Sequence, residues 1–171
     1  MKKFFLIFIF IISIIFIFSE KSLLIEDFEY KNEIITKTGM KIYWTFNEEK
    51  SIYMLLKAPS NGWISIGFNP TFKMKDAKII LIGFEKNNII LEEHLGVSST
   101  KHKKIDEKYI KKYTGKRSKE FSIAEFEIPL NKESRYTITK NEIIKVITAF
   151  HNNSDNFLIR HSKRETLNIK F

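Results

Sequence analysis

Residues 62–84 read GWISIGFNPTFKMKDAKIILIGF and form two apolar segments joined by one polar loop. In the first segment, isoleucine or phenylalanine stands at every second position from Ile64 to Phe68, which is the period of a strand with one buried face. Asn69-Pro70 ends this strand, because proline has no N–H to offer to a sheet. Residues 77–84 are apolar at most positions, which is typical of a strand covered on both faces. The stretch therefore predicts two strands of a β-sheet.

The loop between these two segments carries an isolated methionine, Met74, among charged neighbours. Neither helical nor strand periodicity explains an apolar side chain at this position, so another group should cover it. Its thioether is an adaptable filler of irregular gaps and also a soft ligand for iron or copper. Met74 is therefore expected either to pack beneath a neighbouring loop or to bind a metal or haem group.

The rest of the chain continues as short apolar segments separated by turns. Strands are expected at residues 28–38, 41–46, 52–56, 89–91, 121–128, 143–150, 157–161 and 166–171. The apolar positions change parity within residues 121–128, which predicts a bulge near Ala124. His161 is expected on the same face of its strand as Phe157 and Ile159. About nine or ten short strands, without an amphipathic helix, predict an all-β antiparallel sandwich or barrel.

The N-terminus has the pattern of a secretory signal peptide. Two lysines precede an apolar run at residues 4–18, and Ser19 is small enough to precede a cleavage site. The run is shorter than the roughly 20 apolar residues that a spanning helix needs. Residues 1–19 are therefore predicted to direct export, with a retained membrane anchor as the alternative. Residues 20–171 are predicted to form one secreted domain.

The chain has no cysteine, so an exported domain would depend on its apolar core rather than on disulfides. This also excludes thiolate metal sites, cysteine nucleophiles and covalently attached c-type haem. The formal charge is +9, or +7 after loss of the two leader lysines, which favours acidic or anionic partners. The sequence shows no nucleic-acid-binding motif, nucleophile elbow, Gly-rich nucleotide loop or zinc-protease motif. Neither nucleic-acid binding nor an enzymatic activity of the chain alone is expected.

Residues 101–119 contain nine lysines and arginines against only two acidic residues, Asp106 and Glu107. Runs of like charge repel and stay hydrated, so a solvated loop or short helix is one interpretation. The other is a docking surface for an acidic electron-transfer partner or for an anionic membrane. His94 and His102 lie near this segment, but two histidines without a third ligand make a poor zinc site.

Taken in order, these segments resemble the DOMON family, exported β-sandwich modules that include the haem-binding cytochrome domains of certain extracellular oxidoreductases. The resemblance spans nearly all of the chain after the leader and implies an immunoglobulin-like antiparallel sandwich. The residues that carry it are Gly62-Trp63, Ile66-Gly67-Phe68, Met74 shortly before a strand, Phe126 to Leu130, Val146 to Phe150, and His161 shortly before the last strand.

In haem-binding members, the methionine and histidine at the positions of Met74 and His161 are the two axial ligands of a noncovalent b-type haem. The resemblance therefore implies iron ligation by these residues and electron transfer, because His/Met ligation leaves no open coordination position. The expected partner is a redox protein, either acidic or membrane-bound. Walls of the haem site are expected from Trp63, Phe68, Phe72 and Phe157, and partners for the propionates from Lys73, Lys75 or Arg160.

Two features depart from the family pattern. Members often continue from the methionine as Met-x-Gly-Ala-Asp, whereas this chain has Met74-Lys75-Asp76-Ala77-Lys78. The loop geometry could differ, because glycine reaches backbone conformations that aspartate adopts less readily. His151 stands where a glycine is common, and we interpret it as a polar loop residue beside a potential glycan acceptor, Asn152, rather than as a competing ligand.

The alternative to a haem protein is a haem-free module that binds sugars or related ligands or mediates adhesion. In that case His161 would be a hydrogen-bonded core histidine and Met74 would pack under a loop, since buried polar groups usually find partners.

Overall fold

The computed structural model describes residues 29–86, 88–131 and 134–171. The predicted signal peptide at residues 1–19 lies outside them. The described chain forms eleven β-strands in two antiparallel sheets, one strand more than the upper sequence-based expectation. In this part of the chain, no helix is long and apolar enough to cross a membrane. The predicted all-β antiparallel sandwich is confirmed.

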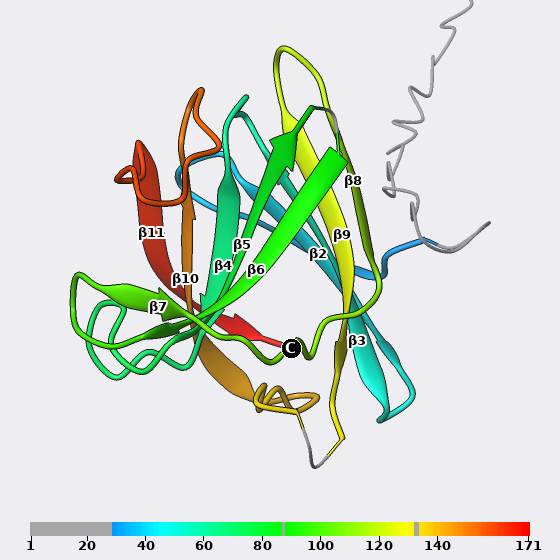
Figure 1. Ribbon diagram of the computed structural model, residues 1–171. Helices are drawn as coiled ribbons and strands as arrows, with labels where there is room; N and C mark the ends of the chain where they lie inside the picture. The colour runs from blue at the N-terminus through cyan, green and yellow to red at the C-terminus, as the bar shows by residue number, and fades with distance from the viewer. Residues whose placement is uncertain (1–28, 87, 132–133) are drawn as a thin grey trace, which may run out of the picture.

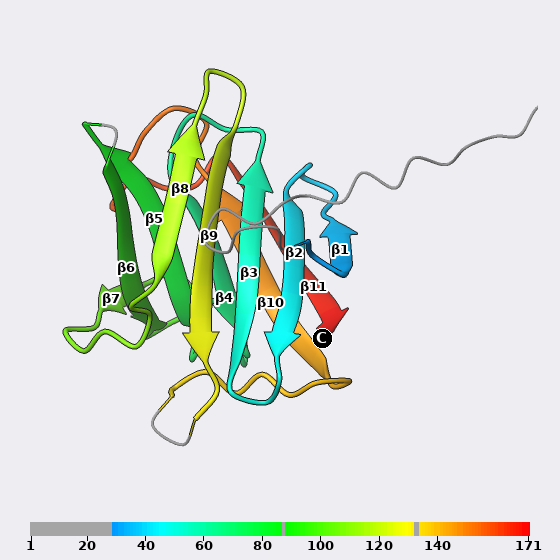
Figure 2. The ribbon, with the colours of Figure 1, turned by 90° about the vertical axis from the view of Figure 1, so that its right-hand side faces the viewer.

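The strands are divided between two sheets that face each other (Figures 1 and 2). The five-stranded sheet consists, in spatial order, of β1 (Asn32–Ile35), β2 (Lys41–Asn47), β3 (Ser51–Ala58), β9 (Ser122–Pro129) and β8 (Tyr113–Arg117). The six-stranded sheet consists, in spatial order, of β11 (Lys163–Lys170), β10 (Ile143–Phe150), β4 (Ile64–Phe68), β5 (Lys78–Glu85), β6 (Asn88–Gly96) and β7 (His102–Lys104).

The stretch at residues 62–84 supplies the two central strands of the six-stranded sheet. β4 and β5 pair with each other, and both are buried on both faces. The sequence predicts this for β5, whereas the alternation in β4 predicts only one buried face. β10 lies on the other side of β4, with Phe150 at its end opposite Ile64 at the start of β4. The β4–β5 loop and the β10–β11 loop therefore leave this sheet at opposite ends (Figure 1).

The main core fills the space between the two sheets. Alternate residues of β4, namely Ile64, Ile66 and Phe68, are fully buried in it. The ring of Phe68 packs edge-on against Tyr136, with the ring centroids 5.9 Å apart. Because side chains alternate along a strand, the intervening residues of β4 face away from the five-stranded sheet. A second apolar cluster forms on that outer face.

The predictions of a bulge near Ala124 and of a loop or short helix at residues 101–119 are wrong. β9 pairs with β3 in continuous register, so it has no bulge near Ala124. The parity of its apolar residues changes because both faces are apolar: Ile123 packs on the outer face of the five-stranded sheet, whereas Phe126 lies in the main core. Residues 101–119 are not simply a loop or short helix, since they contain β7 and β8.

Residues 157–161 form a loop instead of the predicted strand. The cause is Asn156, which accepts hydrogen bonds from backbone amides that would otherwise pair with a neighbouring strand. Its side-chain oxygen accepts from the N–H of Leu158 at 2.9 Å, and its backbone oxygen accepts from the N–H of Ile159 at 3.0 Å. The predicted common face of Phe157, Ile159 and His161 therefore does not exist.

Candidate functional site

The outer face of the six-stranded sheet carries an apolar strip. Its buried members are Trp63, Ala77, Ile79 and Leu81, and its partly buried members are Met74, Ile147, Ala149 and Phe157. These residues come from β5 and β10 and from the loops that adjoin β4, β5 and β10. The strip is the outward counterpart of the core, and it brings together three predicted site residues: Trp63, Met74 and Phe157.

Met74 reaches the strip because the β4–β5 loop lies directly on β6. The backbone of Asp76 donates to the carbonyl of Gly96 at 2.8 Å, and the amide of Gly96 donates to Ala77 at 2.9 Å. A Cβ atom on Gly96 would lie 1.6 Å from the carbonyl oxygen of Met74, so only glycine permits this contact. Met74 is thus held by the backbone of a neighbouring strand.

Asp76 occupies the position at which family members often have glycine, and it adopts a glycine-like backbone. Its φ is 65°, in the left-handed region that aspartate tolerates better than most residues. Its carboxylate accepts a hydrogen bond from the hydroxyl of Thr71 at 2.6 Å, across the same loop. The departure from the family pattern therefore does not prevent the tight turn after Met74.

Phe157 reaches the strip from the opposite end of the sheet, on the β10–β11 loop. Two of its ring atoms lie 3.0 and 3.2 Å from the position that a Cβ on Gly83 would take. The ring therefore lies against the bare backbone of β5. Met74 and Phe157 thus approach one apolar strip from opposite ends.

His161 lies in the same loop as Phe157 and is half-buried, but it is not a member of the apolar cluster. Burial lowers the pKa of His161 below its ordinary 6.5, and the positive charges of Arg164 and Arg160 lower it further, against the effect of a hydrogen bond with its own backbone. The imidazole is consequently held in the neutral form, which is the form that binds metals.

The other predicted residues lie away from the strip. Phe68 is fully buried in the main core between the sheets. Phe72 is 62% exposed, with the ammonium group of Lys73 5.3 Å from its ring centroid. Arg160 is exposed and lies close enough to His161 to affect its pKa. Of the four aromatic residues expected to form walls, the structure brings Trp63 and Phe157 together.

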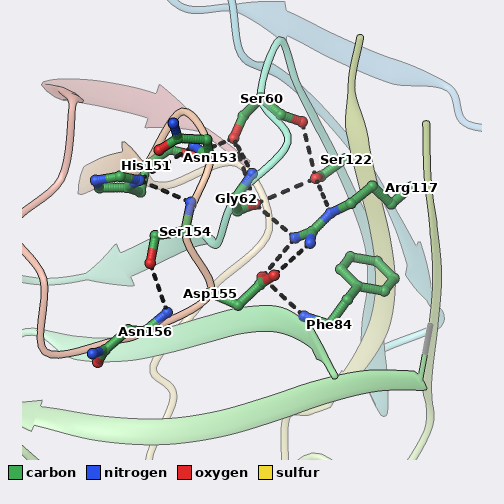
Figure 3. Close-up of polar contacts among 10 residues, drawn as sticks. All are labelled: Ser60, Gly62, Phe84, Arg117, Ser122, His151, Asn153, Ser154, Asp155 and Asn156. Atoms are coloured by element: carbon green, nitrogen blue, oxygen red, sulfur yellow. Dashed lines mark hydrogen bonds and ion pairs between the residues drawn. The ribbon is translucent and has the colours of Figure 1, made fainter. Parts of the chain in front are cut away.

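A polar network anchors the β10–β11 loop (Figure 3). Arg117, at the end of β8, donates to the carboxylate of Asp155 through two nitrogens, at 2.5 and 2.6 Å, and to the carbonyl of Gly62 at 2.9 Å. Asp155 also accepts from the backbone amide of Phe84 at 3.0 Å, and the guanidinium lies 4.4 Å from the Phe84 ring centroid. The network joins the edge of one sheet to the loop of the other.

His151 belongs to this anchoring network. Its Nδ1 accepts from the backbone amides of Asn153 and Ser154, and its carbonyl accepts from Ser60. Its ring also lies beside Trp63, with centroids 6.4 Å apart. These bonds give His151 the role of a loop residue that closes a turn, in agreement with its interpretation from the sequence.

His94 and His102 form a pair on adjacent strands, with their Nδ1 atoms 2.9 Å apart. The Nε2 of His94 donates to Glu92 at 3.0 Å, and Lys104 donates to the same carboxylate. Within the described residues, no three His, Asp or Glu side chains group as ligands for a metal ion. The two histidines therefore bond to each other and to neighbouring side chains of the sheet, as residues with a structural role do.

The geometry defines a class of protein, a two-sheet antiparallel β-sandwich with an apolar strip and two loops converging on the outer face of one sheet. The DOMON domain model matches residues 36–151, which is more than half of the chain, and the protein therefore belongs to the DOMON domain family. His161 lies beyond the matched residues. Among curated protein sequences, no relative matches the chain.

Two solved structures share this fold. One is the cytochrome b domain of pyranose dehydrogenase from Coprinopsis cinerea, with a TM-score of 0.66, 10% identity, and coverage of 84% of this chain and 82% of that one. The other is the cytochrome domain of cellobiose dehydrogenase from Myriococcum thermophilum, with a TM-score of 0.62, 9% identity, and coverage of 79% and 76%. The chain therefore has the fold of cytochrome-type DOMON domains.

The residues of the strip are compatible in kind with haem, the cofactor of b-type cytochromes. A bare metal ion would lack protein ligands here, whereas haem iron needs only two, and a thioether and a neutral imidazole are a known pair. The indole Nε1 of Trp63 is buried in the strip without a hydrogen-bond partner, which leaves a polar atom free for a ligand. Phe157 covers the strip from the loop that carries His161.

The Arg117–Asp155 pair is the feature that sequence reasoning missed. The two residues are far apart in the sequence, and Arg117 stands among many lysines in a basic segment. Nothing in strand periodicity identifies which cation of such a segment turns inward. The available signal is that Arg117 is the one arginine among the nine cations of residues 101–119, and only arginine can donate to a carboxylate through two nitrogens at once.

Proposed function

We propose that this protein is an exported electron-transfer module that binds b-type haem noncovalently, with Met74 and His161 as the axial ligands of the iron. The observation that carries the proposal is the convergence of two loops from opposite ends of one sheet on a single apolar strip. One loop brings Met74 to that strip. The other brings Phe157, four residues before His161.

The chain's own residues would divide the work of binding. Met74 supplies a soft sulfur ligand, held in place by the contact of its loop with Gly96. His161 supplies a neutral nitrogen. Ile79 and Leu81 would supply the apolar surface that a porphyrin needs, and the exposed Lys75, next to Met74, would supply a cation for a carboxylate at the edge of the site.

Haem held by these residues would supply one-electron redox chemistry. Two protein ligands leave no position open for substrate, which favours an electron carrier over an enzyme that acts alone. The anchoring of the histidine loop by Arg117 and Asp155 would limit its movement when the charge of the iron changes.

The partner in this proposal is a redox protein with an acidic surface, because the chain is strongly basic. Export would follow from the apolar leader at residues 4–18. Both statements rest on the sequence, and the haem proposal does not depend on either.

The second candidate function is a haem-free module that binds sugars or related ligands or mediates adhesion. One observation favours it: Trp63 and Leu81 are only 4% and 3% exposed, so the protein's own side chains already cover the strip. A porphyrin would need to replace part of that cover. A haem-free module would keep it closed.

Titration of the full-length chain with ferric haem separates these functions. The proposal predicts a saturable Soret band at one haem per chain and reversible one-electron reduction of the complex. Met74→Leu and His161→Leu should each weaken binding and change the spectrum, because each removes one ligand. Met54→Leu is the matched control, because Met54 lies on β3 in the other sheet and is buried in the main core, and it should change neither. Absence of a Soret band in the wild-type chain would favour the haem-free module.

A further inference from the structure

The β10–β11 loop ends in an exposed apolar tip. Leu158 is 92% exposed and Ile159 is 44% exposed. The hydrogen bonds from their backbone amides to Asn156 fix this tip as a turn, so the two aliphatic side chains are presented by an ordered backbone. Aliphatic side chains held outward in this way need an apolar environment that the described chain does not supply.

Three cations follow this tip within a few residues of sequence. Arg160, Lys163 and Arg164 are exposed, and none of them forms an ion pair with another residue of the described chain. The sequence has no aspartate or glutamate between Asn156 and Arg164. The apolar tip is therefore accompanied by a local charge of three, all of one sign.

The acidic residues on either side of this segment are already engaged. Asp155 is paired with Arg117. Glu165 accepts a hydrogen bond from the backbone amide of Thr38, in the turn between β1 and β2. Neither carboxylate neutralises the three cations by a direct contact, so the positive charge remains available to an external anion.

We propose that the tip formed by Leu158 and Ile159, with Arg160, Lys163 and Arg164, docks on an anionic lipid surface. The aliphatic side chains enter the headgroup layer, and the cations pair with lipid phosphates and carboxylates. The charge of the three cations complements such a surface, and the tip supplies the apolar contact that a charge pairing alone lacks. This inference does not rest on haem binding.

The tip fits an anionic membrane better than the basic segment at residues 101–119 does. Six of the nine cations in that segment are also unpaired within the described chain, because only Lys104, Lys112 and Arg117 form ion pairs. The segment has no exposed large apolar side chain to enter a headgroup layer, however, whereas the tip has two. We therefore assign the membrane-facing surface to the β10–β11 loop.

A label at the tip tests this in the full-length chain. The chain has no cysteine, so Leu158→Cys can carry a single environment-sensitive nitrobenzoxadiazole group. Ile143→Cys is the matched control, because Ile143 is 71% exposed and lies at the far end of β10 from the tip. Each labelled chain is mixed with vesicles of phosphatidylcholine alone or of phosphatidylcholine with phosphatidylserine.

The proposal predicts that the label at position 158 brightens several-fold and shifts to the blue with the phosphatidylserine vesicles only, while the label at 143 does not respond. Lys163→Gln with Arg164→Gln should raise the lipid concentration at half-response by about tenfold or more, since each cation near the surface contributes about fivefold. Added salt should have a similar effect.

Three results would overturn the proposal. Equal responses of the two labels would mean that the N-terminal apolar run alone brings the chain to the vesicle. An equal response to both kinds of vesicle would remove the role of the cations. A response of the 158 label to poly-L-glutamate but not to vesicles would assign the tip to an acidic protein instead.

Discussion

Arg117 in β8 and Asp155 in the β10–β11 loop form a two-nitrogen ion pair that links the edge of the five-stranded sheet to a loop of the six-stranded sheet (Figure 3). Their side chains are 18% and 29% exposed, so the pair is largely shielded from water. The same guanidinium binds the carbonyl of Gly62, next to the first residue of the apolar strip. The loop that carries Phe157 and His161 is thus fixed to the body of the protein.

Arg117→Ala should lower the free energy of unfolding by about 1–3 kcal/mol, because it leaves the Asp155 carboxylate and the Gly62 carbonyl without their shared donor. Lys119→Ala, at an exposed cation two residues away, should change it by less than about 0.5 kcal/mol. Urea denaturation measures both. Equal stability of the two variants would show that the pair does not hold the loop.

Gly96→Ala should displace the loop that carries Met74. The added Cβ cannot be placed 1.6 Å from the Met74 carbonyl, so the loop must move or β6 must shift. A loss of about 1–3 kcal/mol is expected from such overpacking, with weaker haem binding in the same variant. Val97→Ala, at an exposed neighbour, is the control. Unchanged haem affinity in a folded Gly96→Ala protein would contradict the role of this contact in placing Met74.

Asp76→Gly should be tolerated, whereas Asp76→Ala should be less stable than Asp76→Gly by about 1 kcal/mol. Both variants lose the carboxylate that binds Thr71, but only glycine takes the left-handed backbone at φ 65° without strain. Thermal or urea unfolding of the two variants gives the comparison. If alanine proved as stable as glycine, the backbone at residue 76 would not be the constraint.

The free energy of unfolding should fall as the pH drops below about 6.5, in part because of His94 and His102. Burial lowers the pKa of both histidines. For His94, the carboxylate of Glu92 raises the pKa and the charge of Lys104 lowers it, and the effect of burial is the largest. The unfolded chain therefore takes up these protons at a higher pH than the folded chain does. Stability is full above the unfolded pKa and is lost as the pH falls toward the folded values.

Unfolding midpoints at about pH 7.5 and 5.5 test this, with His102→Gln as the variant. The variant should lose less stability than the wild type across this interval, because one of the two titrating groups is gone. Lys103→Gln, an exposed neighbour on the same strand, should behave as the wild type. An identical loss in His102→Gln would show that the histidine pair does not contribute.

The apolar pattern was sufficient to predict the sandwich and the two strands at residues 62–84. The alternation in β4 identified its core face, but not the burial of its outer face. The apolar pattern failed at residues 157–161, where apolar side chains are exposed and Asn156 captures the backbone amides of a turn. The apolar pattern predicts a buried strand only where apolar side chains are buried, and Leu158 is exposed.

The candidate site was only partly predictable for a related reason. Met74 could be identified because its loop gave it no core of its own, and the structure supplies the cover at the apolar strip. Phe68 was expected at the site because it lies near Met74 in sequence, but its side chain points into the core. Sequence neighbours on a strand face opposite ways, so proximity in sequence is a poor guide to a shared site.

The most direct test of the account is the identity of the axial ligands in the haem-loaded full-length chain, measured by near-infrared magnetic circular dichroism together with a redox titration. The account predicts low-spin haem with the charge-transfer band of a methionine sulfur on ferric iron. In Met74→His that band should disappear while the haem stays low-spin, and the reduction potential should fall. A wild-type spectrum without a sulfur ligand, or one that Met74→His and His161→Leu leave unchanged, would contradict it.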